Sequence, residues 1–500
     1  MEGPEAENNG DSIVISGISC RLPGADNMAE FRNSLWQGEN NVQENQRWTK
    51  ELPDGTPKKM GILSDLGKFD AEFFSVNPKV ADVMDPQLRM LLEITHEAIV
   101  DAGVDPHQLK GSDTGVYVAC GLSENMEAFS TNQDHIYAYN PIGNASAMFA
   151  NRISFAFDFK GASYALRNGH ASGLVALDRG LMALRTGQCQ AAVVAGCNLC
   201  LKITTSTQLH RNGLLSSQGH CNCFDEKADG LVRSEGVVAM FLQKQSSAKR
   251  IYSTILHTKL ASYKSQSPVL PPSVEEQSEF LEMVYEEAGV LPEQVSYVET
   301  SGCSVSKAET REMKALAKVI SSKRSSPLLI GSVVSNVGHM ETVSDLVGLA
   351  KLILTMEEDI IPPNLHLCTA NQDLATTFNG QIKVVQEKTR LPGNSGIVSL
   401  NSYGLGNLCA HGIFKAHEDQ KSNSHQATTL SRLFTYSGRT KEGVESAFRL
   451  VQSNTSNVHL HCLLQETAHV APTYHPIRGY IVVNAADGLQ EIKIEIIMLQ

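Results

Sequence analysis

Cysteine and histidine residues gather in one part of the sequence, where they could bind a zinc ion. Cys197 and Cys200 have the spacing Cys-x-x-Cys, and His220, Cys221 and Cys223 follow further along the chain. Thiolate and imidazole groups at such spacings are the usual ligands of structural zinc. The first pair, however, ends an apolar run, in which cysteine behaves as a small hydrophobic residue. This context favours a structural role for the two cysteines over a zinc site.

Glycine-containing motifs elsewhere match catalytic or nucleotide-binding patterns only in part. Ser172 lies in a Gly-x-x-Ser-Gly run between Gly169 and Gly173, one residue away from the spacing of a hydrolase nucleophile elbow. Gly404 and Gly406 reproduce part of a dinucleotide-binding fingerprint, but late in the chain rather than after a first strand. A Gly-x-x-x-x-Gly-Lys-Ser/Thr sequence does not occur. These motifs therefore support neither a hydrolase elbow, nor a Rossmann site, nor a P-loop.

Apolar periodicity predicts the strands and helices that would position such residues. Asp85 and Pro86 are typical of a helix start, and Gly103 is typical of the end of that helix. Further helices are predicted after Gly169, near 274–289 and from about 344 to 357. The predicted strands are 13–17, 114–120, 191–195, 295–299, 328–334, 397–400, 432–437 and 478–483. Alternation of strands and helices predicts a layered α/β fold.

Length, composition and charge exclude several classes of protein. The chain has 500 residues, of which 42% are hydrophobic and 19% charged, so a disordered or fibrous protein is excluded. A net charge of −12 argues against a non-specific nucleic-acid binder. We expect no membrane span, because the longest apolar run, at 346–356, is interrupted by Lys351. The 11 cysteines and the lack of a signal sequence indicate reduced thiols and a cytoplasmic location.

Four segments occur in an order that resembles the β-ketoacyl synthase, or condensing enzyme, of animal-type fatty acid synthases. They read Arg-Asn-Gly-His-Ala-Ser-Gly (167–173), Glu-Thr-Ser-Gly-Cys-Ser-Val (299–305), Ser-Asn-Val-Gly-His (335–339) and Asn-Ser-Tyr-Gly-Leu-Gly-Asn (401–407). The framing stretches agree: 84–93, 150–154, 224–225, 233–236 and 363–366. Residues 68–74 indicate the animal synthase rather than a bacterial enzyme. The resemblance covers about 13–414 and continues weakly at 437–440 and 478–480, which are similar to the linker domain before the acyltransferase.

This resemblance implies a fold, an assembly and a reaction. The fold class is α/β, a thiolase-like fold of two similar βαβ-rich halves followed by a partial small α/β linker domain. Family members form homodimers and condense acyl with malonyl thioesters through a cysteine at a helix N-terminus, two histidines and a lysine, with no cofactor or metal. The strand at 191–195 and the helix that starts at residue 171 are expected near the dimer interface. The acyl carrier protein and other fatty acid synthase regions are the further implied partners. The expected parts are a leader (1–10), a ketosynthase-like domain (11–415), a linker (416–430), a partial linker domain (431–485) and a divergent tail (486–500).

Most positions at which this family keeps its catalytic residues differ in the present chain. The position of the nucleophilic cysteine holds His170, and the position of the first catalytic histidine holds Ser301. The lysine position holds Val334, whereas the second histidine is kept as His339. The two pantetheine-contacting threonines and the aromatic gate are also replaced. These positions hold Cys303, Val305 and Leu405.

We therefore expect a fatty acid synthase-like chain that does not condense, either a pseudo-enzyme or a piece of a longer, divergent synthase. An acyl group on His170 would be lost to water, because acyl-imidazoles hydrolyse readily. Cys303 matches a loop position rather than a helix start, so nothing is expected to activate its thiol. Two alternatives stay open: an altered but active acyl-transferring or decarboxylating condensing enzyme, and a non-catalytic dimeric interaction module.

Overall fold

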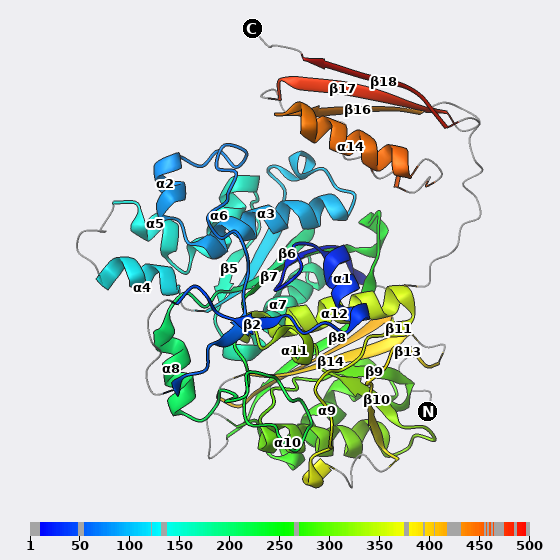
Figure 1. The fold of residues 1–500 in the computed structure, drawn as a ribbon. Coiled ribbons are helices and arrows are strands. Elements are labelled where there is room, and N and C mark those ends of the chain that lie inside the picture. The colour runs from blue at the N-terminus through cyan, green and yellow to red at the C-terminus, as the bar shows by residue number, and fades with distance from the viewer. Residues whose placement is uncertain are drawn as a thin grey trace.

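A computed structural model of the chain consists of a large α/β body and a small C-terminal unit (Figure 1). It describes residues 11–48, 55–121, 123–131, 138–264, 270–374, 380–393, 396–404, 406–417, 432–454, 457, 460–461, 464, 475–484 and 488–496. The predicted leader at 1–10 lies outside the described residues, as do Leu405 and residues 418–430 of the predicted linker. None of the described helices is both long and apolar enough to cross a membrane.

One sheet of 11 strands runs through the large body. In spatial order it consists of β12 (Ile382–Val384), β10 (Leu328–Gly331), β9 (Val295–Glu299), β14 (Ile397–Gly404), β15 (Leu408–Ala416), β8 (Ser253–Ser262), β1 (Ile13–Arg21), β7 (Gly236–Lys244), β6 (Ala191–Asn198), β4 (Thr114–Cys120) and β5 (Ser163–Leu166). The antiparallel contact between β1 and β8 is short, with Val14 opposite Thr254 and Ile15 opposite Ser253. This contact divides the sheet into two halves.

The two halves repeat one pattern of strands and helices. In the first half β1 leads through α3 (Pro86–Asp101) to β4, and β5 leads through α7 (Ser172–Arg185) to β6 and β7. In the second half β8 leads through α9 (Val274–Ala288) to β9, and β10 leads through α12 (Ser344–Glu358) to β14 and β15. The pairings also correspond, since β5, β4 and β6 are parallel, as are β10, β9 and β14. The predicted arrangement of two similar βαβ-rich halves is thereby confirmed.

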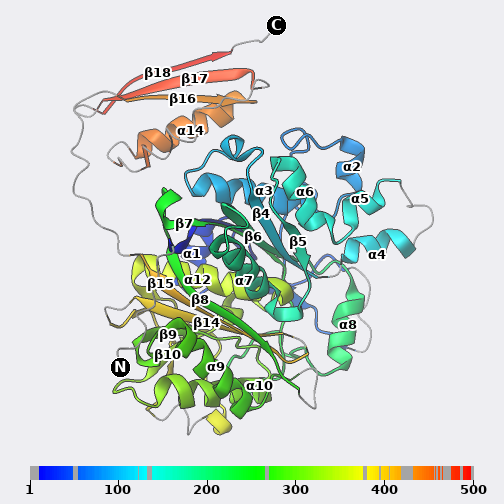
Figure 2. The same cartoon turned by 180° about the vertical axis from the view of Figure 1, so that it is seen from behind.

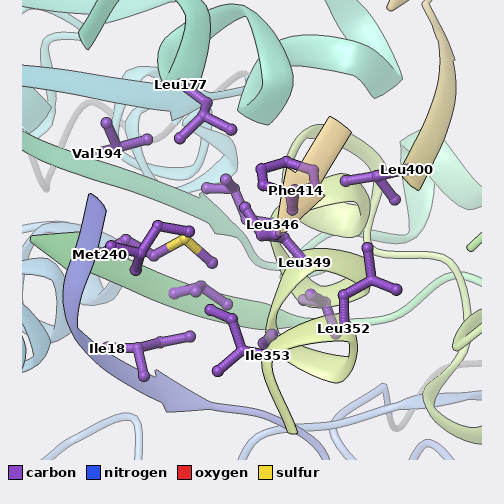
Figure 3. Close-up of a cluster of buried hydrophobic side chains, with 14 of the residues drawn as sticks. Ile18, Leu177, Val194, Met240, Leu346, Leu349, Leu352, Ile353, Leu400 and Phe414 are labelled. Atoms are coloured by element: carbon purple, nitrogen blue, oxygen red, sulfur yellow. The ribbon is translucent and has the colours of Figure 1, made fainter. Parts of the chain in front are cut away.

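Helices α7 and α12 occupy corresponding places in the two halves and form the centre of the core. Figure 2 shows α7 and α12 in the middle of the body. Figure 3 shows side chains of the core between them, with Leu177 and Val194 on one side of the cluster and Leu400 on the other. Helix α12 is buried continuously from Asp345 to Met356, which is typical of a helix enclosed on all sides. Helix α7 is buried except along one face, where Arg179, Met182 and Arg185 are exposed. The residues that begin these helices are therefore held in rigid surroundings.

Shorter elements surround the sheet. The remaining helices of the large body are α1 (Met28–Gln37), α2 (Pro78–Val83), α4 (Glu124–Thr131), α5 (Asn140–Asn144), α6 (Met148–Phe157), α8 (Ile203–Arg211), α10 (Ser306–Leu316) and α11 (Val334–Val337). Its remaining strands are β2 (Val42–Glu44), β3 (Lys59–Gly61), β11 (Ile360–Ile361) and β13 (Thr389–Arg390). The strand predicted at 328–334 ends at Gly331, because residues 334–337 form the helical turn α11. The strand predicted at 397–400 extends to Gly404, because it pairs with β15 along its whole length.

The small C-terminal unit is a three-stranded antiparallel sheet with one helix. It contains β16 (Arg432–Gly438), α14 (Lys441–Ser453), β17 (Ile477–Asn484) and β18 (Gly488–Ile496). Strand β18 falls within the segment 486–500 that the sequence sets apart as a tail, yet it pairs with β17. The boundary expected at residue 485 is therefore wrong for residues 488–496. An ion pair of 2.7 Å between Arg439 and Asp70 connects this unit to the large body.

Candidate active site

His170 lies at the entrance to α7, in a tight turn that follows β5. Gly169 begins this turn with φ of 67°, a conformation that favours glycine. The Ser172 hydroxyl donates a hydrogen bond to the Gly169 carbonyl (2.6 Å) and accepts one from the Asn168 N–H (2.8 Å). This arrangement fixes the backbone on both sides of the partly buried His170, whose side chain faces the interior cavity.

His339 lies beside His170, just before the start of α12. The centroids of the two imidazole rings are 4.5 Å apart, and the ring planes cross at 66°. Nδ1 of His339 accepts a hydrogen bond from the Glu341 N–H at 3.1 Å, so the neutral ring carries its proton on Nε2. Gly338 makes the preceding bend with φ of 80°. The local backbone thus determines both the position and the tautomer of His339.

Both imidazoles favour the neutral form. Burial lowers the pKa of His170, against the opposing effect of the Glu341 carboxylate. Burial also lowers the pKa of His339 well below its usual value, and His170 and Arg233 act in the same direction. Arg233 lies close by in a buried ion pair with Glu341, at 2.6 Å. The pair of imidazoles therefore offers neutral donors and acceptors rather than a positive charge.

A small cavity joins the residues that the sequence selects for the site. His170, Ser301, Val334 and His339 all line it, although they come from three separate segments. Its volume of about 20 Å³ is sufficient for a water molecule, but not for an acyl chain. The structure thus brings these four side chains together, while their chemical roles stay predictions.

Buried carboxyl groups on the cavity wall are the residues that sequence reasoning missed. Glu299 forms an ion pair with the fully buried Lys351 (2.8 Å) and accepts a hydrogen bond from the Val333 N–H (2.5 Å). Asp345, 3% exposed, also lines the cavity, and burial raises its pKa to about 7. Asp345 directly follows Ser344 at the start of a strongly apolar helix. An acidic residue at such a helix start is the signal that could have drawn attention to it.

Glu312 supports the cavity from outside its wall. Its Oε1 accepts hydrogen bonds from the Ser301 N–H (3.0 Å) and from the Asn401 side chain (2.8 Å). Burial raises the pKa of Glu312 to about 7. Since Ser301 and Asn401 both line the cavity, Glu312 holds two of its walls together.

The positions expected to contact pantetheine lie apart from this cavity. Neither Cys303 nor Val305 lines it, and Val305 instead precedes the first turn of α10. Burial raises the pKa of the Cys303 thiol, so the neutral thiol is favoured. This environment argues against Cys303 as a displaced nucleophile. Leu405, the third position, lies outside the described residues.

The cysteine and histidine cluster gains no support as a zinc site. Cys197 and Cys200 are buried at the end of β6 and just after it, and burial raises the pKa of both thiols well above the usual value. In the part of the chain that the structure describes, no group of three or more His, Cys, Asp or Glu side chains is arranged to hold a metal ion. The structural interpretation of the two cysteines agrees with this environment.

Comparisons with known proteins define the class to which this fold and cavity belong. Models of the β-ketoacyl synthase family match nearly the whole chain: the N-terminal domain at residues 10–248, the C-terminal domain at 252–368 and the ketoacyl-synthetase C-terminal extension at 371–482. The chain belongs to the β-ketoacyl synthase family. The predicted thiolase-like fold, with N- and C-terminal halves and a C-terminal extension, is confirmed.

Individual relatives come from fatty acid and polyketide synthesis. A fatty acid synthase sequence of the goose Anser anser anser is 44% identical over 352 residues, which are 70% of this chain and 100% of the goose sequence. The 6-methylsalicylic acid synthase of the fungus Aspergillus terreus is 32% identical over 446 residues, 84% of this chain but 24% of that protein. The chain thus spans the whole of the goose sequence and about a quarter of the fungal synthase.

Solved ketosynthase structures share the fold. The ketosynthase from module 6 of the bacillaene synthase of Bacillus subtilis superposes with a TM-score of 0.83 at 26% identity, covering 95% of this chain and 82% of that one. The ketosynthase from module 1 of the bacillaene synthase of Bacillus amyloliquefaciens gives a TM-score of 0.81 at 25% identity, covering 95% and 83%. The large body is therefore a ketosynthase domain.

Proposed function

We propose that this chain is a ketosynthase region of the animal fatty acid synthase type that has lost the ability to condense acyl and malonyl thioesters. The observation that carries the proposal is the residue at the head of α7. The family resemblance assigns the acyl-carrying cysteine to this position, and here it holds the neutral imidazole of His170, 4.5 Å from that of His339. An imidazole cannot hold an acyl group through a second substrate-binding step, because acyl-imidazoles react readily with water.

Two further replacements, Ser301 and Val334, weaken the decarboxylation step of the reaction. Decarboxylation of a malonyl group requires donors where the enolate oxygen forms, and each lost donor typically costs about 100- to 1000-fold in rate. Ser301 supplies no imidazole, and Val334 supplies no ammonium group. Among the positions of the family's two histidines and lysine, only His339 keeps a side-chain N–H, on Nε2. These losses act on a different step from that of His170, so restoring one residue is not expected to restore condensation.

A second candidate function is decarboxylation without condensation. It is favoured by the two neutral imidazoles side by side, since His339 and His170 could each donate one hydrogen bond to a thioester carbonyl. A third candidate function is a non-catalytic interaction module. It would require only that the large body is folded and forms a homodimer in the cytoplasm. Under each function, the acyl carrier protein or other synthase regions would be the partners.

One set of assays separates these functions. Purified protein is incubated with acetyl- and malonyl-carrier thioesters, and ketoacyl product, carbon dioxide and covalent acyl adducts are measured, the last by mass spectrometry. We expect no ketoacyl product and no stable adduct. Carbon dioxide released without ketoacyl product would support the decarboxylase, and ketoacyl product from the unmodified chain would overturn the proposal. A His170→Ala/His339→Ala variant provides the background rate.

A further inference from the structure

Asp345 connects the first turns of the two central helices. Its Oδ2 accepts a hydrogen bond from the Leu174 N–H in the first turn of α7, at 2.7 Å. Its Oδ1 accepts one from the Leu346 N–H of its own helix α12, at 3.0 Å. The side chain is 3% exposed and lines the same cavity as His170 and His339. A carboxyl group therefore lies inside the cavity, at the N-terminal end of α7.

Gly173 makes room for this carboxyl group. A Cβ atom built on Gly173 would lie 2.1 Å from Oδ1 of Asp345 and 2.6 Å from Cγ of Leu346. Distances this short exclude any side chain at residue 173 while Asp345 keeps its place. Glycine is unfavourable inside a helix unless space requires it. The contact between the two helices thus depends on having glycine at residue 173 opposite Asp345.

The position of Asp345 determines the electrostatic character of the cavity. The N-terminus of a helix carries unsatisfied N–H groups and a partial positive charge, which stabilise anions placed before it. A carboxylate on the Leu174 N–H takes up that stabilisation. Other charges near the cavity do not restore it, because Lys351 is paired with Glu299, and Arg233 with Glu341. Burial raises the pKa of Asp345 to about 7, so the group is largely ionised above neutral pH.

We infer that Asp345 is a specificity-determining residue, which occupies the anion-stabilising end of α7 and closes the cavity to anionic groups. This inference deepens the proposed function and rests on it. A thiolate at residue 170 and the carboxylate of a malonyl group would both meet a like charge there. Asp345 should therefore disfavour anionic groups at residue 170 more strongly than uncharged groups. Restoring the thiol of a condensing enzyme would not restore its reactivity while Asp345 is present.

The test places a reporter thiol in the cavity of the full chain. In His170→Cys, the alkylation rate of the introduced thiol is measured between pH 6 and pH 10 by peptide-resolved mass spectrometry, with neutral iodoacetamide and anionic iodoacetate in parallel. The same rates are measured in His170→Cys/Asp345→Asn. The matched control is His170→Cys/Glu309→Gln, because Glu309 is also a buried carboxyl that accepts two backbone hydrogen bonds, from Phe224 and Ser304 (2.8 Å each), and it does not line the cavity.

Removing the charge of Asp345 should have two effects. At pH 7.5 we expect iodoacetamide to react with the introduced thiol about tenfold faster in the Asp345→Asn background, since a like charge shifts a neighbouring pKa by about one unit or more. The ratio of the iodoacetamide rate to the iodoacetate rate should fall severalfold as well. The Glu309→Gln background should change neither quantity.

Two results would overturn the inference. One is that the alkylation rate depends on pH in the same way with and without Asp345. The other is that Glu309→Gln changes the alkylation rates as much as Asp345→Asn does. If Asp345→Asn fails to fold, as judged by circular dichroism, Asp345→Gly removes the charge without filling the space beside Gly173. These rates do not depend on whether the unmodified chain condenses thioesters. The inference can thus fail while the proposed function stands, and the reverse is also true.

Discussion

His170 and His339 form a pair of neutral imidazoles in a cavity that holds about one water molecule. Replacing His170 by cysteine alone should give a protein that is acylated slowly and condenses poorly, because Ser301 still supplies no imidazole. We expect its condensation rate to lie about 100- to 1000-fold below that of His170→Cys/Ser301→His/Val334→Lys, the typical effect of missing donors. Equal rates for the two variants, measured as ketoacyl product per active thiol, would contradict this account.

Glu309 should make the stability of the protein depend on pH. Burial raises the pKa of its carboxyl from the ordinary 4.5 to about 8, so the folded state holds a proton that the unfolded state releases between these values. Stability contributed by this proton is present below about pH 4.5 and is lost as the pH rises to about 8. Between pH 5.5 and pH 8 the unfolding free energy should fall in both proteins. The decrease in the unmodified chain should exceed the decrease in Glu309→Gln by more than about 1 kcal/mol. Urea titrations at the two pH values measure both changes, and parallel changes in the two proteins would refute the assignment.

At the scale of single residues, the sequence predicted four residues that line one cavity but not all of their neighbours. The motif order identified His170, Ser301, Val334 and His339, because such motifs depend on spacing along the chain. Asp345 was missed because its meaning depends on a contact with α7, which begins far earlier in the sequence. Chain spacing carries no information about such a contact until the fold is known.

At the scale of elements, the contact between α7 and α12 depends on Gly173. Gly173→Ala would place a methyl group 2.1 Å from Asp345 and 2.6 Å from Leu346, so the two helices would have to separate. We expect a loss of about 1–3 kcal/mol in unfolding free energy, as is usual for overpacked cores. Gly67→Ala is the control, since a Cβ at Gly67 has no described neighbour within 4 Å and its φ is not positive. Chemical denaturation of both variants gives the comparison, and equal stabilities would show that the contact is not tight.

Helix and strand positions were predicted best where apolar periodicity was strong. The helix expected at about 344–357 is α12, Ser344–Glu358, because its apolar residues recur along nearly its whole length. The strand expected at 328–334 is shorter, because residues 334–337 turn into α11 although Val333 and Val334 are apolar and β-branched. Strand β18 was missed although Ile492, Ile494 and Ile496 alternate with charged residues, because the family resemblance was not followed beyond residue 485. A local pattern was thus available for this strand and was not used.

At the scale of the whole molecule, β5 is one edge strand of the large sheet, and β12 is the edge strand at the opposite end. The strand expected near the dimer interface is β6, but β6 lies inside the sheet, between β4 and β7. Tyr164 on β5 is 54% exposed, and Phe155 on the neighbouring α6 is 73% exposed. Exposed aromatic side chains beside an edge strand are typical of an interaction surface.

We therefore expect the predicted homodimer to form along β5. Light scattering at micromolar concentration should give twice the mass of the chain, and Tyr164→Glu/Phe155→Glu should give the mass of the monomer. Leu291→Glu is a suitable control, because Leu291 is a large exposed apolar residue preceding β9, in the second half of the molecule. A monomeric unmodified chain would contradict the expectation, and so would a double variant that remains a dimer.

The central claim is that this ketosynthase domain has lost condensation because of the residues in one cavity. The most direct measurement is the rate of ketoacyl product formation from acetyl- and malonyl-carrier thioesters by the unmodified chain and by His170→Cys/Ser301→His/Val334→Lys, with and without Asp345→Asn. We predict no product from the unmodified chain, weak activity from the triple variant and higher activity once Asp345 is also replaced. Product formed by the unmodified chain at a rate comparable to that of the restored variants would contradict the account.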